Sequence, residues 1–249
     1  MATPTDLVKV IAATTGEDEA TVAQHDRNLV IAGLRAKHGR GPSTYKPTAR
    51  DGAVLLTSVR GSHRVRDGVA TIRRYLQTQE HRAHWAQHYP ADKQGGMGPA
   101  NVWEQYGIPE LAALPPEHTF IDALTVLITL ATEGRLNSEL QYYGAQDLSC
   151  VRIMLFWPQT HARISMHSWR DPRDEKSHKS VQADYQSNEP PPAWIKECRQ
   201  PLPEEIAGQS GIKPQSDRWS ETNALPLLYI GALLAGKIDE LPKIKGDCT

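Results

Sequence analysis

The chain has 249 residues, of which 39% are apolar and 23% charged, and its formal net charge is −1. This composition excludes a disordered chain and is typical of a globular protein with one large domain or two modest ones. No apolar run approaches the ~20 residues of a membrane-spanning helix, and the N-terminus lacks the pattern of a signal peptide, so we expect a cytoplasmic protein with no membrane partner.

The charge is unevenly distributed along the chain. Residues 1–88 hold 13 Lys and Arg against 8 Asp and Glu, a net charge of +5, whereas residues 89–249 hold 15 against 21, a net charge of −6. Contacts from basic side chains to phosphates supply most of the affinity of DNA-binding proteins. A basic stretch is also what an ordinary solvated surface carries, so a motif is needed to decide between the two.

The first expected element is a short helix that begins after Thr3. Thr3 and Asp6 have the pattern of a capping box, and Gly16 is placed to end the helix. A second helix then runs from the acidic turn at 17–19 to about Ala32, because acids favour the first turn of a helix. The joining glycine predicts a tight connection between the two helices.

The spacing of small and apolar residues across these two helices is that of a helix-turn-helix. Such a crossing needs a small residue on the first helix, a glycine in the turn and a β-branched residue on the second. Ala12, Gly16 and Val22 meet these needs at offsets of four and six residues. Residues 35–46 are basic and rich in glycine, which predicts a hairpin after the second helix.

The segment ATVAQHDRNLVIAGLRAKHGRG at residues 20–41 resembles the recognition helix and wing of winged helix-turn-helix transcriptional regulators of bacteria and phages. The resemblance covers about Leu7 to Lys46, under a fifth of the chain. It implies a protein that binds double-stranded DNA in a sequence-specific manner.

The second helix predicts which side chains would contact DNA. Val22 and Leu29 are seven residues apart and define its buried face, beside a polar face. Asn and Gln amides pair with adenine, Arg pairs with guanine, and basic wing residues contact phosphates or the minor groove. The alternative is an ordinary helical hairpin with a polar exposed face. The residues expected at DNA are Thr21, Gln24, Arg27, Asn28, Arg35, Lys37, Arg40 and Lys46.

Two further helices are expected before the chain changes character. A capping box at Thr48 opens one, and apolar residues from Val65 to Leu76 indicate another, which continues toward His88. On that helix His88 would share a face with His81 and His84, as metal ligands do. No nearby side chain completes a ligand set, so we expect a solvated helix end and no metal site.

The rest of the chain has the pattern of an α+β region. Residues 89–118 are rich in Gly and Pro and predict an irregular linker. Alternating apolar residues predict a β-hairpin and a third strand, and two apolar stretches predict helices. These elements are expected at 120–132 (helix), 151–157, 162–166 and 181–185 (strands) and 225–235 (helix).

The predicted fold class is therefore α+β with two domains. Residues 1–88 would form a winged helix-turn-helix DNA-binding domain with additional helices, and 89–118 the linker. Residues 119–249 would form a C-terminal domain in which helices pack on an antiparallel hairpin or small sheet. The apolar faces of the helices at 65–76 and 225–235 suit either a homodimer contact or the core of a single chain.

The leading functional hypothesis is a DNA-binding transcriptional regulator, bacterial or encoded by a mobile element. Its partners would be double-stranded DNA, a second copy of the chain, and RNA polymerase or another protein at the C-terminal domain. No nucleophile elbow, phosphate-binding loop or dinucleotide motif occurs, so we expect neither an enzyme nor a cofactor. A phage packaging or plasmid maintenance protein is the second hypothesis, and an enzyme with a site in the C-terminal half is the third.

Overall fold

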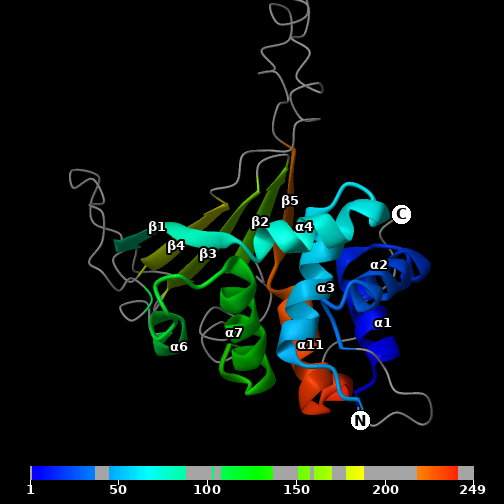
Figure 1. The fold of residues 1–249 in the computed structure, drawn as a ribbon. Helices are drawn as coiled ribbons and strands as arrows, with labels where there is room; N and C mark the ends of the chain where they lie inside the picture. The colour runs from blue at the N-terminus through cyan, green and yellow to red at the C-terminus, as the bar shows by residue number, and fades with distance from the viewer. Residues whose placement is uncertain are drawn as a thin grey trace, which may run out of the picture.

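A computed structural model describes residues 2–36, 45–87, 103, 108–136, 151–157, 160–169, 178–187 and 218–240. Helices cover one side of a five-stranded antiparallel sheet with strand order β1-β4-β3-β2-β5 (Figure 1). The expected α+β class, with helices packed on an antiparallel sheet, is confirmed.

The two N-terminal helices form where the sequence predicts them. In α1 (Pro4–Thr15) the Thr3 hydroxyl accepts from the backbone N–H of Asp6, whose carboxylate accepts from Thr3 in return. Gly16 follows with a φ of 74°, a left-handed conformation that glycine adopts without strain. Helix α2 (Glu19–Ile31) begins three residues later. The capping box and the glycine stop are therefore confirmed.

The next helix forms where the sequence predicts it, the one after it is shorter than predicted, and a strand follows. Helix α3 (Ala49–Gly61) opens with the predicted capping box, and a 3₁₀ turn, η1 (Val65–Asp67), leads into α4 (Gly68–Tyr75). The chain then forms β1 (Thr78–Gln87) instead of continuing as a helix toward residue 88. The prediction of helix there was wrong, because β1 pairs with β4 along its whole length and this tertiary contact overrides local propensity.

The later helices agree closely with the prediction. Helix α7 (Phe120–Thr132) and helix α11 (Leu225–Ala235) have the expected bounds, and η4 (Ile238–Glu240) follows α11. The segment predicted as a linker contains a short helix, α6 (Pro109–Ala112). Much of the rest of that segment lies outside the described residues.

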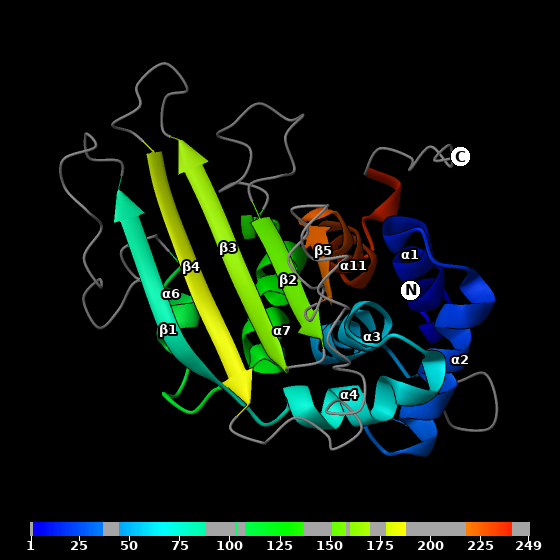
Figure 2. The same cartoon turned by 90° about the horizontal axis from the view of Figure 1, so that it is seen from above.

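The sheet contains the predicted hairpin at its centre. Strand β2 (Val151–Trp157) pairs with β3 (His161–Trp169), which pairs with β4 (His178–Ser187) (Figure 2). The hairpin and third strand are confirmed. Strand β5 (Arg218–Asn223), which pairs with the other edge of β2, was not predicted. With β1 at the opposite edge, two strands distant in sequence complete the sheet.

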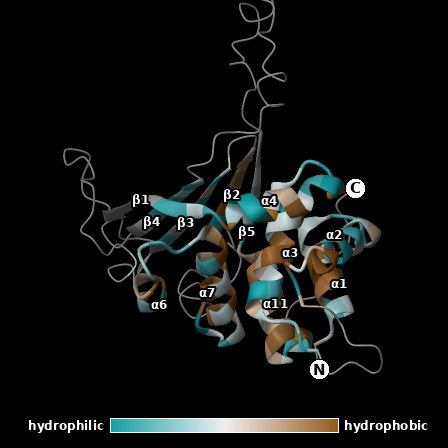
Figure 3. Cartoon of the chain, viewed as in Figure 1, coloured by the Kyte–Doolittle hydropathy of each residue, from teal (hydrophilic) through white to brown (hydrophobic). Residues whose placement is uncertain are grey.

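The core lies between the sheet and a layer of helices. Alternate strand residues such as Ile153, Ile164 and Ala183 are fully or almost fully buried, as the period of two requires. Helices α7 and α3 contact this face, and apolar residues are prominent on α1, α3, α7 and α11 (Figure 3). A Cβ added at Gly231 of α11 would lie 2.6 Å from Ala131 of α7, so only glycine allows these helices to approach so closely.

The two predicted domains share this core. One hydrophobic cluster runs from Leu7 in α1 to Leu233 in α11, with α1 against α11 and α3 against α7. Strand β1 is an edge of the sheet formed by the C-terminal half. A boundary near residue 88 therefore does not divide the core of the described residues.

A buried polar network joins the sheet to the start of α7. The His118 Nδ1 donates to the Pro115 carbonyl (2.8 Å), and its Nε2 lies 3.1 Å from the Tyr185 hydroxyl and 3.5 Å from Glu80. The Trp103 indole donates to the same Glu80 carboxylate at 3.2 Å. Burial alone lowers the pKa of His118, but the hydrogen bonds and the Glu80 charge outweigh it and raise that pKa.

Within the described ranges, no helix combines the length and the apolar character that a membrane span requires.

Candidate nucleic-acid interface

Helix α2, the predicted recognition helix, is fixed to the molecule by one face. Val22 and Leu29 are fully buried, as predicted, and His25 lies between them with 4% of its surface exposed. This face contacts α1, α3, η1 and α4. The burial of His25 was not predicted from the sequence, because histidine is a polar residue. The signal that places His25 on the buried face is its spacing of three residues from Val22 and four from Leu29.

His25 makes the polar contact of this buried face. Its Nδ1 shares a hydrogen bond of 2.8 Å with the Ser58 hydroxyl of α3. Burial lowers the pKa of His25, which favours the neutral ring. Gly68, at the start of α4, packs against both groups, and a Cβ there would lie 2.5 Å from the Ser58 oxygen. The rotation of α2 on α3 is therefore fixed by a directional bond as well as by apolar packing.

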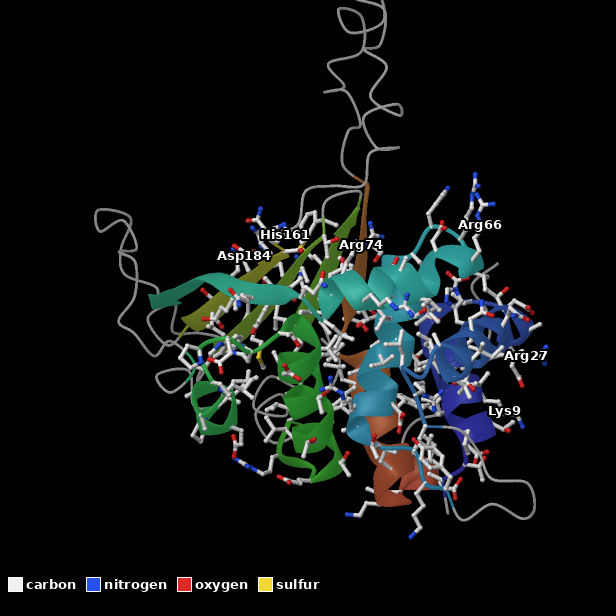
Figure 4. The ribbon with its side chains drawn as sticks, viewed as in Figure 1. Lys9, Arg27, Arg66, Arg74, His161 and Asp184 are labelled. Atoms are coloured by element: carbon white, nitrogen blue, oxygen red, sulfur yellow. The ribbon has the colours of Figure 1, made fainter. Side chains whose placement is uncertain are left out.

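The opposite side of α2 carries four side chains that we name the outer stripe: Gln24, Arg27, Asn28 and Ile31. Gln24 and Arg27 are exposed, Asn28 is half-buried, and the Gln24 amide donates to the Asn28 carbonyl oxygen at 2.8 Å. Figure 4 shows Arg27 projecting away from the sheet. Thr21, also predicted to contact DNA, is half-buried one turn earlier.

Ile31 is the member of the outer stripe that the sequence analysis missed. Its side chain is 78% exposed, which is unusual for a large apolar residue. It follows Gln24 by seven residues and Arg27 by four, the spacing that places residues on one face of a helix. That spacing could have identified it.

Arg35 is not available to DNA, contrary to the prediction. Its side chain is fully buried and forms ion pairs with Asp26 of α2 and with Asp51 of α3, the latter at 3.3 Å. Burial alone raises the pKa of Asp51, but hydrogen bonds from Tyr45 and Thr48 and the charge of Arg35 outweigh it and lower that pKa. The correction has a simple cause: two carboxylates from different helices meet Arg35, and sequence spacing does not reveal this.

The remaining predicted wing residues are only partly described. Lys46 is exposed just before α3, while Lys37 and Arg40 lie outside the described residues. At the other end of α2, Glu17, Asp18 and Glu19 are all exposed. The charge along α2 therefore changes from negative at its start to positive at Arg27.

The histidine-rich segment does not form the helix that the sequence predicts. His81 and His84 belong to strand β1, and His88 lies outside the described residues. A spacing of three residues places two positions on one face of a helix but on opposite faces of a regular strand, whereas a spacing of four keeps them on one face in both. Over the part of the chain that the structure describes, no group of His, Cys, Asp and Glu side chains could hold a metal ion.

The two apolar faces considered for a homodimer are used largely inside the chain. Ile72 and Tyr75 of α4 are buried, and α4 contacts α3. Leu227, Ile230 and Leu233 of α11 are buried, and α11 contacts α1, α3 and α7. The burial of these residues favours the second alternative left open by the sequence, in which both apolar faces belong to the core of a single chain.

No protein-family model, curated protein or solved structure matches this chain.

Proposed function

We propose that this protein binds double-stranded DNA through the outer stripe of α2 and acts as a sequence-specific transcriptional regulator. The observation that carries the proposal is the contrast between the two faces of α2. One face is fixed by Val22, His25 and Leu29, and the other presents Gln24, Arg27 and Asn28 toward solvent. A rigid helix with amide and guanidinium groups on its outer face suits the major groove.

Each member of the outer stripe has a partner among the base edges. Gln24 and Asn28 amides pair with adenine, Arg27 pairs with guanine, and Ile31 packs against a thymine methyl group. The hydrogen bond between Gln24 and Asn28 orders both amides before any DNA arrives. Pre-ordering reduces the entropy that is lost on binding.

The charge on α2 sets the orientation of the proposed complex. The acids at 17–19 repel phosphates, so the N-terminal end of α2 would point away from the DNA backbone. Contacts would come from the middle and the C-terminal half of the helix, from Gln24 onward, and from the basic segment that follows it. In that segment the candidates for phosphate contacts are Lys37, Arg40 and Lys46. Arg35 is excluded from such contacts because it is buried in ion pairs.

The test is a binding titration on a duplex selected from a randomised library and on random duplex. Gln24→Ala and Arg27→Ala should each weaken binding to the selected duplex about 5- to 150-fold, since a bidentate base contact is worth ~1–3 kcal/mol. Both should melt like the parent, because substitution of an exposed polar residue usually changes stability by under ~0.5 kcal/mol. Lys9→Ala on α1, which is also exposed, is the matched control and should bind normally.

Two outcomes would contradict parts of the proposal. If Gln24→Ala and Arg27→Ala both bind the selected duplex like the parent, α2 does not read bases. If the library yields no preferred sequence, the protein is a non-regulatory DNA binder.

Lys37→Ala and Arg40→Ala should weaken binding to every duplex about equally and should flatten its dependence on salt.

A further inference from the structure

His25 is the ionisable side chain that lies in the face by which α2 is attached to the rest of the molecule. It is buried there between Val22 and Leu29. The main contacts of α2 are with α1, α3, η1 and α4, and none of the strands is among them. Since α2 lies outside the layer that covers the sheet, its attachment can weaken while the rest of the core stays folded.

The surroundings of His25 suit a neutral ring. The Ser58 hydroxyl, 2.8 Å from Nδ1, is the polar partner that the described residues give it. A hydroxyl can donate to an unprotonated ring nitrogen or accept from a protonated one, so this hydrogen bond does not require a charge. A Cβ added at Gly68 would lie only 2.8 Å from the same nitrogen, so the backbone of α4 closes this side of the ring.

Among the described residues, no charged group compensates a proton on His25. The elements packed against α2 carry these half-buried or buried ionisable side chains: Asp6, Asp51, Arg60, Asp67, Arg74 and Tyr75. None of them forms a hydrogen bond or ion pair with His25, and Asp26 of α2 itself is paired with Arg35. Burial lowers the pKa of His25 below its usual 6.5, and no neighbouring charge opposes this shift. A proton on the ring would therefore be an uncompensated charge inside the contact.

The effect of pH on the attachment of α2 has a definite sign. Above pH 6.5 the ring is neutral whether α2 is attached or released, so the attachment keeps its full strength. As the pH falls below 6.5, the released helix takes up a proton that the attached helix binds less readily, and the attachment weakens until the pH passes the folded-state pKa. Acid therefore disfavours the orientation in which α2 presents its outer stripe.

We propose that His25 is a positioning residue that makes base reading by α2 sensitive to acid, so that protons release the protein from its specific duplex. The inference rests on the proposed function, because it concerns the orientation of the side chains that would lie in the major groove. A ligand shifts a conformational equilibrium only if it binds the two forms differently, and a proton meets this condition at His25. Contacts with phosphates carry no sequence information and do not require the outer stripe, so binding to random duplex should not fall in parallel.

The test is a titration of the full-length parent and its variants with the selected duplex and with random duplex across this pH range. Between pH 6.5 and the folded-state pKa, the affinity of the parent for the selected duplex should fall by up to about tenfold per pH unit, because one proton is taken up. His25→Asn keeps a hydrogen-bonding atom near the place of Nδ1 but takes up no proton. Its affinity for the selected duplex should therefore depend little on pH.

A matched control and a second measurement support this test. His63 is an exposed histidine that follows α3 and lies outside the buried face of α2, so His63→Asn should keep the pH profile of the parent. Hydrogen exchange of the parent without DNA does not depend on whether His25→Asn folds. After correction for the intrinsic effect of pH on exchange, the amides of α2 should lose protection on acidification before those of α7.

Three results would overturn the proposal. The first is a parent whose affinity for the selected duplex does not change with pH, and the second is a His25→Asn variant, shown by its thermal melt to be folded, with the pH profile of the parent. The third is loss of protection in α2 and α7 at the same pH, which would mean that acid unfolds the chain as a whole. Failure of the proposed function is a different result, in which Gln24→Ala and Arg27→Ala bind the selected duplex like the parent at neutral pH.

Discussion

The contact between α7 and α11 and the contact between α2 and α3 hold their helices by different means. Helices α7 and α11 approach closely through Gly231 and otherwise bury apolar side chains. Helix α2 is joined to α3 by the His25–Ser58 hydrogen bond and by Arg35, which lies between carboxylates of both helices. Apolar burial supplies free energy without a preferred direction, whereas hydrogen bonds and ion pairs are directional. The helix proposed to read DNA is thus the one whose orientation is specified by polar groups.

The largest expected effect on stability comes from removing the cation Arg35 from the polar contact between α2 and α3. Arg35→Ala leaves Asp26 and the buried Asp51 without their counter-charge. We expect the free energy of unfolding to fall by about 3–5 kcal/mol, the usual cost of breaking a buried pair. Chemical denaturation followed by circular dichroism measures it.

A surface ion pair provides the control for this prediction. Arg50 donates to Asp122 at 2.8 Å, but its side chain is 53% exposed. Arg50→Ala should therefore cost under about 1 kcal/mol. Equal losses for Arg35→Ala and Arg50→Ala would show that the Arg35 cluster is not a buried polar contact of the kind described.

A smaller effect is expected at the apolar contact. Gly231→Ala places a methyl group against the backbone of Ala131, which should force α7 and α11 apart and cost about 1–3 kcal/mol. For a chain of this size the melting temperature should fall by about 2–4 °C for each kcal/mol. Scanning calorimetry measures both.

Gly16 supplies the comparison for Gly231. A Cβ at Gly16 meets no atom within 4 Å, so Gly16→Ala would cost only the left-handed backbone strain of about 1–2 kcal/mol. Should Gly231→Ala prove milder than Gly16→Ala, the close approach of the two helices would be adjustable, and the contrast with the polar contact would weaken.

The smallest effect is a pH dependence of stability from the His118–Glu80 pair. The pKa of His118 is raised from 6.5, so its contribution is complete below that pH and is lost as the pH rises through the folded-state pKa. Burial alone raises the pKa of Glu80, but hydrogen bonds from His118, Trp103 and Tyr185 lower it below 4.5. The contribution of Glu80 is complete above 4.5 and is lost as the pH falls through its folded-state pKa.

The pair should therefore contribute most between pH 4.5 and 6.5. His118→Gln should lose stability relative to the parent at pH 5.5 and lose less at pH 8. His25 titrates in the opposite sense, because its lowered pKa disfavours the folded state only in acid, so it cancels in the comparison of parent and variant. A parent–variant difference that is constant from pH 5 to 8 would contradict the assignment.

The sequence was sufficient where local chemistry decides the structure. Capping boxes at Thr3 and Thr48 located helix starts, and alternation located the β2–β3 hairpin, because these signals act over a few residues. It was insufficient where distant segments meet. Local patterning predicts a helix where β1 forms, because the partner strand β4 begins about 90 residues after β1 ends. It also predicts a surface cation at Arg35, because the two carboxylates that bind Arg35 come from two different helices.

In the candidate site, too, the sequence predicts what the helix repeat determines and not what contacts between distant segments determine. Val22 and Leu29 were correctly placed on the buried face of α2, since a helix repeat fixes relative faces. His25 and Ile31 contradict the usual hydrophobicity rule, one polar and buried, the other apolar and exposed. The residue type alone does not predict whether either side chain is buried. For His25 the burial depends on its contacts with Ser58 and Gly68.

The position of β1 at one edge of the sheet also constrains how the chain can fold while it is being synthesised. Thr78 pairs with Ser187, more than 100 residues later. At a translation rate of ~5–20 residues per second, β1 would leave the ribosome ~5–20 s before its partner. During that interval the apolar sides of α1 and α3 lack α11, and in its first part they also lack α7, so the nascent N-terminal part has a defined period in which a chaperone, or a second nascent chain, can reach it.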